Sequence, residues 1–199
     1  MIRLFTIFCK LNQLPFSDRQ WMEQDISGFC SCCAVCPFCG AKGCLDVFAH
    51  YERYLVELQA GRPVTYRVKV PRYRCASCGH THALLSSCLV PYRSYSLRLI
   101  LHVLRCYFLR LKTVTGICEA VGITPATLYQ WKNVFLRQKA LWLGVLCDLE
   151  RSASSFLSEV TGEFLKGFSN TFGFSLLQHM PGTDREVPLG KCNSEGTIT

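Results

Sequence analysis

Two cysteine turns of the same form lie far apart in the chain. The first reads CPFCG from Cys36 to Gly40 and the second reads CASCG from Cys75 to Gly79, with 35 residues between the inner cysteines. Thiolates bind zinc at about 2.3 Å, and a structural site takes four ligands in a tetrahedron. Glycine after the second cysteine permits a left-handed backbone, which lets amides point at the sulfurs. The spacing predicts one structural Zn²⁺ per chain, bound by Cys36, Cys39, Cys75 and Cys78.

Disulfide bonds or a redox function at these two turns agree less well with the sequence. The apolar run after Met1-Ile2-Arg3 is too short for a signal peptide, so we expect a reducing cytoplasm, where disulfides are rare. A redox C-x-x-C needs a strand–helix context, which neither copy has. Nearby residues that could replace a ligand are Cys32, Cys33, Cys44, His80 and His82. The remaining cysteines in apolar helical contexts predict buried thiols at Cys88, Cys106, Cys118 and Cys147.

Charge is unevenly distributed along the 199 residues. Residues 1–61 carry 5 basic and 6 acidic residues, and residues 140–199 carry 4 basic and 7 acidic residues. Residues 62–139 instead carry 13 basic residues against one acidic residue, Glu119. A basic block of this size indicates a polyanionic partner, with a merely solvated basic face as the alternative.

The start of the basic block has the pattern of a strand. From Arg62 to Arg74 apolar and basic residues alternate, up to an interruption at Pro71. This pattern predicts one buried and one basic face. Because phosphate contacts come largely from Arg and Lys, we expect contacts to the DNA backbone from Arg67, Lys69, Arg72 and Arg74.

A pair of helices follows. Thr113 can cap a helix from Val114 to Val121, and Gly122 provides a turn that needs a positive φ. Thr124 is then an N-cap with Pro125 at the first helical position. The core-facing residues are expected to be Val114, Ile117, Cys118, Val121, Ile123, Leu128, Trp131 and Phe135.

The opposite face of the second helix could enter a major groove. Glutamine and asparagine match the donor and acceptor of adenine, and alanine can touch a thymine methyl group. We therefore expect base contacts from Ala126, Thr127, Gln130 and Asn133, and phosphate contacts from Tyr129, Lys132 and Arg137. Plain helical packing without DNA binding is the alternative for this pair.

The other segments give weaker signals. Residues 46–59 read as helical or mixed, and Ser96–Leu111 reads as an apolar helix with one polar stripe. A helix is expected over 125–140. Ser152–Phe172 predicts an amphipathic helix, because apolar residues recur every four positions at Phe156, Val160, Phe164, Phe168 and Phe172. The polar residues after Met180 predict a loose tail.

Taken together, residues 33–140 resemble a known arrangement. A zinc ribbon followed by a homeodomain-like helix-turn-helix is similar to the N-terminal DNA-binding region of bacterial insertion-sequence transposases. The stretch CGHTHALL…VPYRSYSL, from Cys78 to Leu97, resembles a family of short uncharacterised bacterial proteins with the same layout. The resemblance implies DNA binding. It does not imply strand cleavage, because the transposases carry a large catalytic domain and only about 60 residues follow the last helix here.

The predicted fold class is α+β and mainly helical. It consists of a small four-cysteine zinc ribbon, a three-helix homeodomain-like helix-turn-helix and a C-terminal helix. The expected divisions are an N-terminal segment at 1–29, the ribbon at 30–92, the helix-turn-helix at 93–140, a helical segment at 141–180 and a flexible tail at 181–199.

The predicted function is a zinc-stabilised protein that binds double-stranded DNA, related to transposases but without their catalytic domain. We expect no enzyme, because the sequence offers no Ser/His/Asp set, no phosphate loop and no open metal position. We expect no membrane association and a cytoplasmic, nucleoid-associated location. The alternatives are a transcriptional regulator of the same architecture, or a protein-interaction module. A homo-oligomer or protein partner would then bind through the 152–172 helix.

Overall fold

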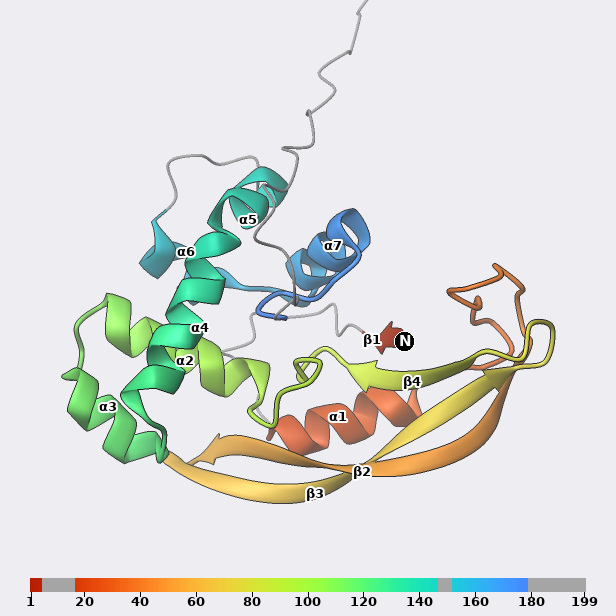
Figure 1. The fold of residues 1–199 in the computed structure, drawn as a ribbon, viewed down its shortest axis with the longest axis horizontal. Coiled ribbons are helices and arrows are strands. Elements are labelled where there is room, and N and C mark those ends of the chain that lie inside the picture. Colours follow the sequence, from red (N-terminus) through yellow and green to blue (C-terminus); the bar gives the residue numbers. More distant parts are fainter. Residues whose placement is uncertain (5–16, 147–151, 179–199) are drawn as a thin grey trace, which may run out of the picture.

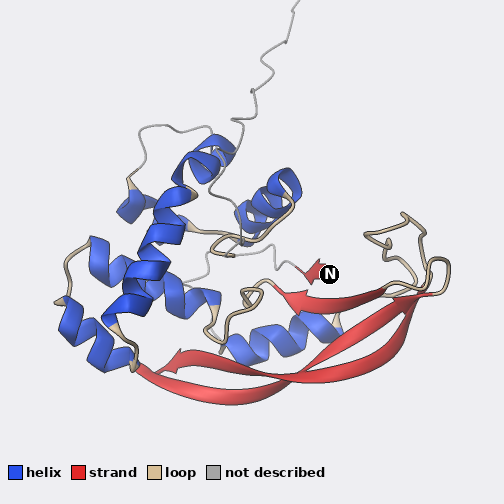
Figure 2. Ribbon diagram, in the orientation of Figure 1, coloured by secondary structure: helices blue, strands red, loops and turns tan. Residues whose placement is uncertain are grey.

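The computed structural model describes residues 1–4, 17–146 and 152–178, and shows a curved sheet with helices gathered along one side (Figures 1 and 2). The strands are β1 (Ile2–Leu4), β2 (Leu45–Gln59), β3 (Arg62–Cys75) and β4 (Thr81–Ser86). The helices are α1 (Asp18–Ser27), α2 (Leu97–Phe108), α3 (Val114–Val121), α4 (Pro125–Arg137), α5 (Lys139–Leu146), α6 (Ala153–Glu159) and α7 (Gly162–Phe172). The predicted tail at 181–199 and Cys147 lie outside the described residues.

The sheet is mixed and has the order β1-β4-β3-β2. A long antiparallel hairpin, β2–β3, dominates it, with a register that runs from Leu45 opposite Cys75 to Gln59 opposite Arg62. One irregularity falls at Phe48, between Val47 and Ala49. β4 pairs antiparallel with the far end of β3, and β1 pairs parallel with β4.

The predicted fold class is wrong. The described chain is built on a four-stranded mixed sheet with seven helices, rather than on a mainly helical ribbon and three-helix unit. The first cysteine turn precedes β2 and the second joins β3 to β4, so both lie at the open end of the long hairpin and do not form a small separate ribbon. The domain divisions expected from the sequence stay predictions.

Residues 46–59 caused most of this error. They form β2, and their composition is mixed, because Leu, Glu, Ala and Gln favour helix whereas Val, Tyr and Phe favour strand. Pairing with β3 along the whole length of β2 decides for strand. The expected break at Pro71 is also wrong, because β3 runs through it. Pro71 is accommodated because β4 pairs with β3 at Arg72–Arg74, so at Pro71 β3 is paired with β2 alone.

The helices after β4 follow the sequence closely. α3 has the predicted bounds, and α2 begins one residue later and ends three residues earlier than expected. The caps at Thr113 and Thr124 accept the N–H groups of Gly116 and Thr127. Gly122 has a φ of 68°. The helix expected over 125–140 ends at Arg137, and α5 begins at Lys139.

Residues 152–172 form two helices instead of one. α6 ends before Val160, and Thr161 caps α7 by accepting the N–H of Phe164. The apolar residues of the segment still face inward. Phe156 stacks on Trp142 at 4.2 Å between ring centroids, and Phe156 also packs edge-on against Phe164. These aromatic side chains therefore belong to the hydrophobic core of the chain.

Apolar packing forms two clusters of unequal size. The larger holds 35 buried hydrophobic residues from the sheet, α1 and the helices α2–α7, including the predicted Leu128, Trp131 and Phe135. The smaller consists of Cys36, Leu45 and Cys75 at the cysteine end of the hairpin. Cys88, Cys106 and Cys118 are buried as predicted. None of the helices among the described residues is long and apolar enough to cross a bilayer.

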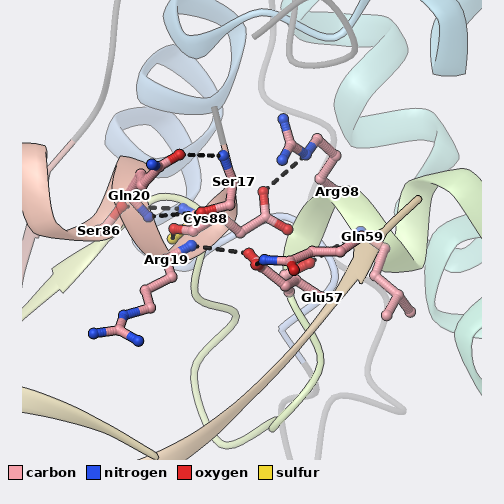
Figure 3. Close-up of polar contacts among 11 residues, drawn as sticks. Ser17, Arg19, Gln20, Glu57, Gln59, Ser86, Cys88 and Arg98 are labelled. Carbon is pink, nitrogen blue, oxygen red and sulfur yellow. Dashed lines mark hydrogen bonds and ion pairs between the residues drawn. The ribbon is translucent and has the colours of Figure 1, made fainter. Parts of the chain in front are cut away.

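A polar network fixes α1 to the sheet and to α2 (Figure 3). The buried carboxylate of Glu57, near the end of β2, accepts the backbone N–H of Arg19 at 2.9 Å. Asp18, also buried, pairs with Arg98 of α2 at 2.8 Å. Burial raises the pKa of Asp18, and the charge of Arg98 opposes this effect. The network thus links α1, β2 and α2, which are distant in the sequence.

Candidate metal centre and the exposed face of α4

The four predicted cysteines come together at one end of the hairpin. The sulfur atoms of Cys36, Cys39, Cys75 and Cys78 all lie within 4.8 Å of one another. Cys36 Sγ lies 3.8 Å from Cys78 Sγ, and Cys39 Sγ lies 3.7 Å from Cys75 Sγ. This group could hold a metal ion. It lies at the opposite end of β2–β3 from the hairpin turn, which lies by α3 in Figure 1.

The two cysteine turns have the same backbone geometry. The N–H of Cys36 donates to Ala41 at 2.8 Å, and the N–H of Cys75 donates to the equivalent carbonyl at His80 at 2.9 Å. Each following glycine donates back to the first cysteine of its turn, with φ of 75° at Gly40 and 73° at Gly79. A left-handed conformation at both glycines closes both turns around their sulfurs.

Backbone amides favour thiolate at the first cysteine of each turn. The amide of Cys39 is the largest influence on Cys36 and lowers the pKa of that thiol to about 5. Burial would raise the pKa of Cys75, but the amides of Cys78 and Ser77 hydrogen-bond to its sulfur and the pKa falls below its ordinary value. Four thiolates so close together repel one another, and a cation would remove that repulsion.

A histidine adjoins the cysteine group. His82 Nε2 of β4 lies 3.3 Å from Cys36 Sγ, and the ring is buried. With its proton on Nε2, the ring donates a hydrogen bond to that sulfur. His80 is instead exposed and stacks on Phe38 at 3.6 Å between centroids. His82 therefore lies where an outer-sphere residue supports a metal ligand.

A second group of thiols lies just before the first turn. The sulfurs of Cys30, Cys32 and Cys33 also lie within 4.8 Å of one another, and all three residues are exposed. Cys44 stays apart from both groups and donates to the Lys42 carbonyl at 3.2 Å.

The residues expected to contact bases lie on the outside of α4. Ala126, Gln130 and Asn133 are exposed, and Thr127 is half-buried with its hydroxyl 3.0 Å from that of Thr124. Arg137 at the end of the helix is exposed. Contact between these residues and DNA stays a prediction.

Tyr129 and Lys132 adjoin a groove that the sequence reasoning missed. Lys132 Nζ lies 5.3 Å from the ring centroid of Tyr129 and 5.5 Å from that of Tyr107. Tyr107 is also part of a groove of about 510 Å³ between α2 and α3, lined by Tyr107, Phe108, Arg110, Lys112, Thr113 and Val114. The mixture of aromatic and basic residues in 107–112 is the sequence signal that could have found it.

The basic residues of β3 do not share one face. Successive residues of a strand point to opposite sides. Arg67 and Lys69 therefore lie on one side of β3, and Arg72 and Arg74 on the other. All four are exposed. Arg67 also pairs with Glu52 across the hairpin at 3.5 Å.

The excess of basic residues differs between the β2–β3 hairpin and the helices that follow. β2 and β3 together carry six basic and three acidic residues, because the partner strand supplies the acids. Residues 93–139 carry eight basic residues and one acidic residue. The greater excess of positive charge therefore belongs to the helices around the groove.

Comparison with known proteins adds one result. Residues 36–131 match a protein family described as a domain of unknown function (DUF6431). The matched range begins at Cys36, the first cysteine of the group of four, and ends within α4. Comparison with curated proteins and with solved structures gives no match.

Proposed function

We propose that this chain is a zinc-stabilised protein that binds double-stranded DNA through the N-terminal half of α4 and has no catalytic role. The observation that carries the proposal is the exposed polar face of α4 next to the aromatic and basic groove at Tyr107–Val114. The resemblance of the sequence to transposase DNA-binding regions is consistent with it. The proposal includes a nucleoid location and a transposase-related role. A transcriptional regulator of the same architecture is the alternative.

Zinc fits the geometry of the four-cysteine group. Sulfurs held about 2.3 Å from a central zinc in a tetrahedron are separated by about 3.8 Å. The separations of 3.8 Å and 3.7 Å between cysteines of different turns agree with that edge length. Four thiolates leave no open position, so we propose that the ion is structural.

The arrangement around α4 supports binding to a duplex. The Thr124 cap and Pro125 start the helix abruptly, and its first turns present Ala126 and Gln130 to solvent. Lys132 lies between two tyrosine rings, with Arg110 and Lys112 lining the groove that Tyr107 also lines. Bases would then be read by α4, and the flanking phosphates would be held by the groove.

The hairpin is a second, weaker contact in this proposal. One face of β3 carries Arg67 and Lys69 and the other carries Arg72 and Arg74, so one duplex can lie against only one pair. Exposed pairs such as Arg67 and Glu52 are also weak and exchange readily with other partners. The double substitutions Arg67→Ala/Lys69→Ala and Arg72→Ala/Arg74→Ala distinguish the two faces.

The protein-interaction alternative is less well supported. The phenylalanines of 152–172 that would form a contact surface pack within the chain, and Phe156 and Phe168 are 2% and 0% exposed. A partner for this segment stays a prediction.

The test is selection of bound sequences from a random duplex library at two salt concentrations. We expect Gln130→Ala to relax the preference at one or two base pairs, by about 1–3 kcal/mol each, with little change in non-specific affinity. Arg110→Ala/Lys112→Ala should lower the slope of log affinity against log salt by about 0.9 for each lost phosphate contact. Lys166→Ala, an exposed change on α7, is the matched control and should leave the slope unchanged. A protein that selects no sequence and shows no salt-dependent binding would overturn the proposal.

A further inference from the structure

We propose that Cys30, Cys32 and Cys33 form a second metal site, a three-thiolate site for the soft ion Cu(I), separate from the four-cysteine group. The three sulfurs converge from a single turn. Cys30 Sγ lies 2.7 Å from Cys32 Sγ, and Cys32 Sγ lies 3.8 Å from Cys33 Sγ. An ion about 2.3 Å from each of three sulfurs keeps the sulfurs about 3.8–4.0 Å apart, so the Cys32–Cys33 separation fits directly and Cys30 Sγ must rotate about 1 Å away from Cys32 Sγ to join them.

The turn that carries these cysteines is anchored to the rest of the fold. Phe29, just before it, packs edge-on against Tyr73 of β3 with 5.0 Å between ring centroids. On the other side, Gly43 donates to the Ala34 carbonyl at 2.9 Å. A side chain at Gly43 would place a Cβ 2.9 Å from the Cys32 carbonyl oxygen, so glycine is needed where the two segments meet. The backbone of the turn is thus fixed on both sides, which keeps the three cysteines close together.

The number of donors decides which ion fits. In the described part of the chain, no other histidine, cysteine, aspartate or glutamate joins the three sulfurs. Structural zinc sites take four ligands, whereas Cu(I) is selected by soft sulfur donors and is satisfied by three. All three cysteines are exposed, so an ion can reach them from solvent without opening the core.

The experiment uses the full chain loaded with one zinc, reduced and desalted under anaerobic conditions. Cu(I) is supplied as its coloured complex with bathocuproine disulfonate. Transfer is followed by loss of that colour, and zinc and copper in the desalted protein are then measured by mass spectrometry. We expect one copper to be taken up while the zinc is retained.

Substitutions locate the ion. The triple change Cys30→Ser/Cys32→Ser/Cys33→Ser should abolish transfer while zinc content and DNA binding stay as in the parent. Cys33→Ser alone should weaken binding by more than the roughly tenfold to hundredfold that loss of an outer-sphere partner costs. Cys44→Ser, a half-exposed thiol of the same region, is the control and should transfer copper normally.

Three results would overturn the assignment. The triple variant could take up as much copper as the parent, or copper could enter only as zinc leaves in equal amount. Alternatively, the parent could hold two zinc ions of which the triple variant holds one, which would make this a zinc site. DNA binding is measured on the same samples, so failure of the copper site is distinguishable from failure of the proposed function.

Discussion

Removal of the four-cysteine site should unfold one end of the molecule and leave the other intact. The perturbation is Cys75→Ser, at the end of β3. Among the described residues, the fully buried members of the cluster around it are Cys36, Leu45 and Cys75, with partly buried residues such as Tyr73 packed against them. Burial of one leucine contributes about 1.5–3 kcal/mol. Structural zinc contributes about 10–16 kcal/mol in small domains. An ion bound there would therefore be the dominant stabilising contribution at this end, whereas 35 buried hydrophobic residues of the described chain stabilise the rest.

Hydrogen exchange read by mass spectrometry measures this directly. Loss of even a quarter of the metal contribution, about 3 kcal/mol, raises exchange more than about a hundredfold. We expect that increase in peptides covering 30–46 and 73–82, including the hydrogen-bonded amides of Cys36 and Gly40. Peptides of α2–α4 should change by less than about threefold.

Cys44→Ser is the control, since this thiol lies outside the group of four. An equal rise across α2–α4 would refute the division into two independently stabilised ends. No rise at the cysteine end would show that these thiols hold no ion.

Three further changes test other contacts. His82→Ala removes the hydrogen bond to Cys36 and should lower metal affinity about tenfold to hundredfold, measured by competition with a chromophoric chelator, and glutamine should restore part of it. Arg98→Met leaves the buried Asp18 carboxylate without its cation and should cost about 3–5 kcal/mol in urea unfolding. Gly40→Ala forces a side chain to a φ of 75°, costs about 1–2 kcal/mol, and should therefore weaken metal binding roughly fivefold to thirtyfold.

Each of these changes has a matched control. His80→Ala removes an exposed ring that stacks on Phe38 and should leave metal affinity within about twofold. Arg105→Met changes an exposed residue of the same helix as Arg98 and should alter stability by about 0.5 kcal/mol or less. Gly61→Ala introduces the same backbone strain at the opposite end of the hairpin, so it should lower stability but not metal affinity. If a substitution and its control had equal effects, the contact named for that substitution would not be the cause of the effect.

Local signals in the sequence predicted local features well. Two C-x-x-C-G turns predicted which cysteines meet, and the caps at Thr113 and Thr124 predicted where α3 and α4 begin. One such signal was overlooked. Ser17 and Gln20 form a capping box that starts α1, and the S-x-x-Q pattern is visible in the sequence.

Features that depend on distant partners could not be predicted in this way. β2 owes its extended form to β3, and β1 is three residues long and pairs with β4 some 80 positions later. The charge count had the same weakness. It treated residues 62–139 as one basic block, and only the pairing of β3 with β2 places Glu52 against Arg67. The clustering of Cys30 with Cys32 and Cys33 likewise needed the turn geometry.

The two ends of β3 bury opposite sides of the strand. This limits which insertions and deletions the protein can accept between the two cysteine turns. Val68 and Val70 enter the large cluster from one side, whereas Cys75 and Tyr73 belong to the small cluster on the other. Adding one residue between them would turn Cys75 away from its partners. A hairpin that lengthens must gain about two residues on each strand to keep both ends correctly oriented. Among natural relatives, insertions between the two cysteine turns should therefore come in steps of about four residues, with single-residue changes confined to the irregularity at Phe48 and the turn at 60–61.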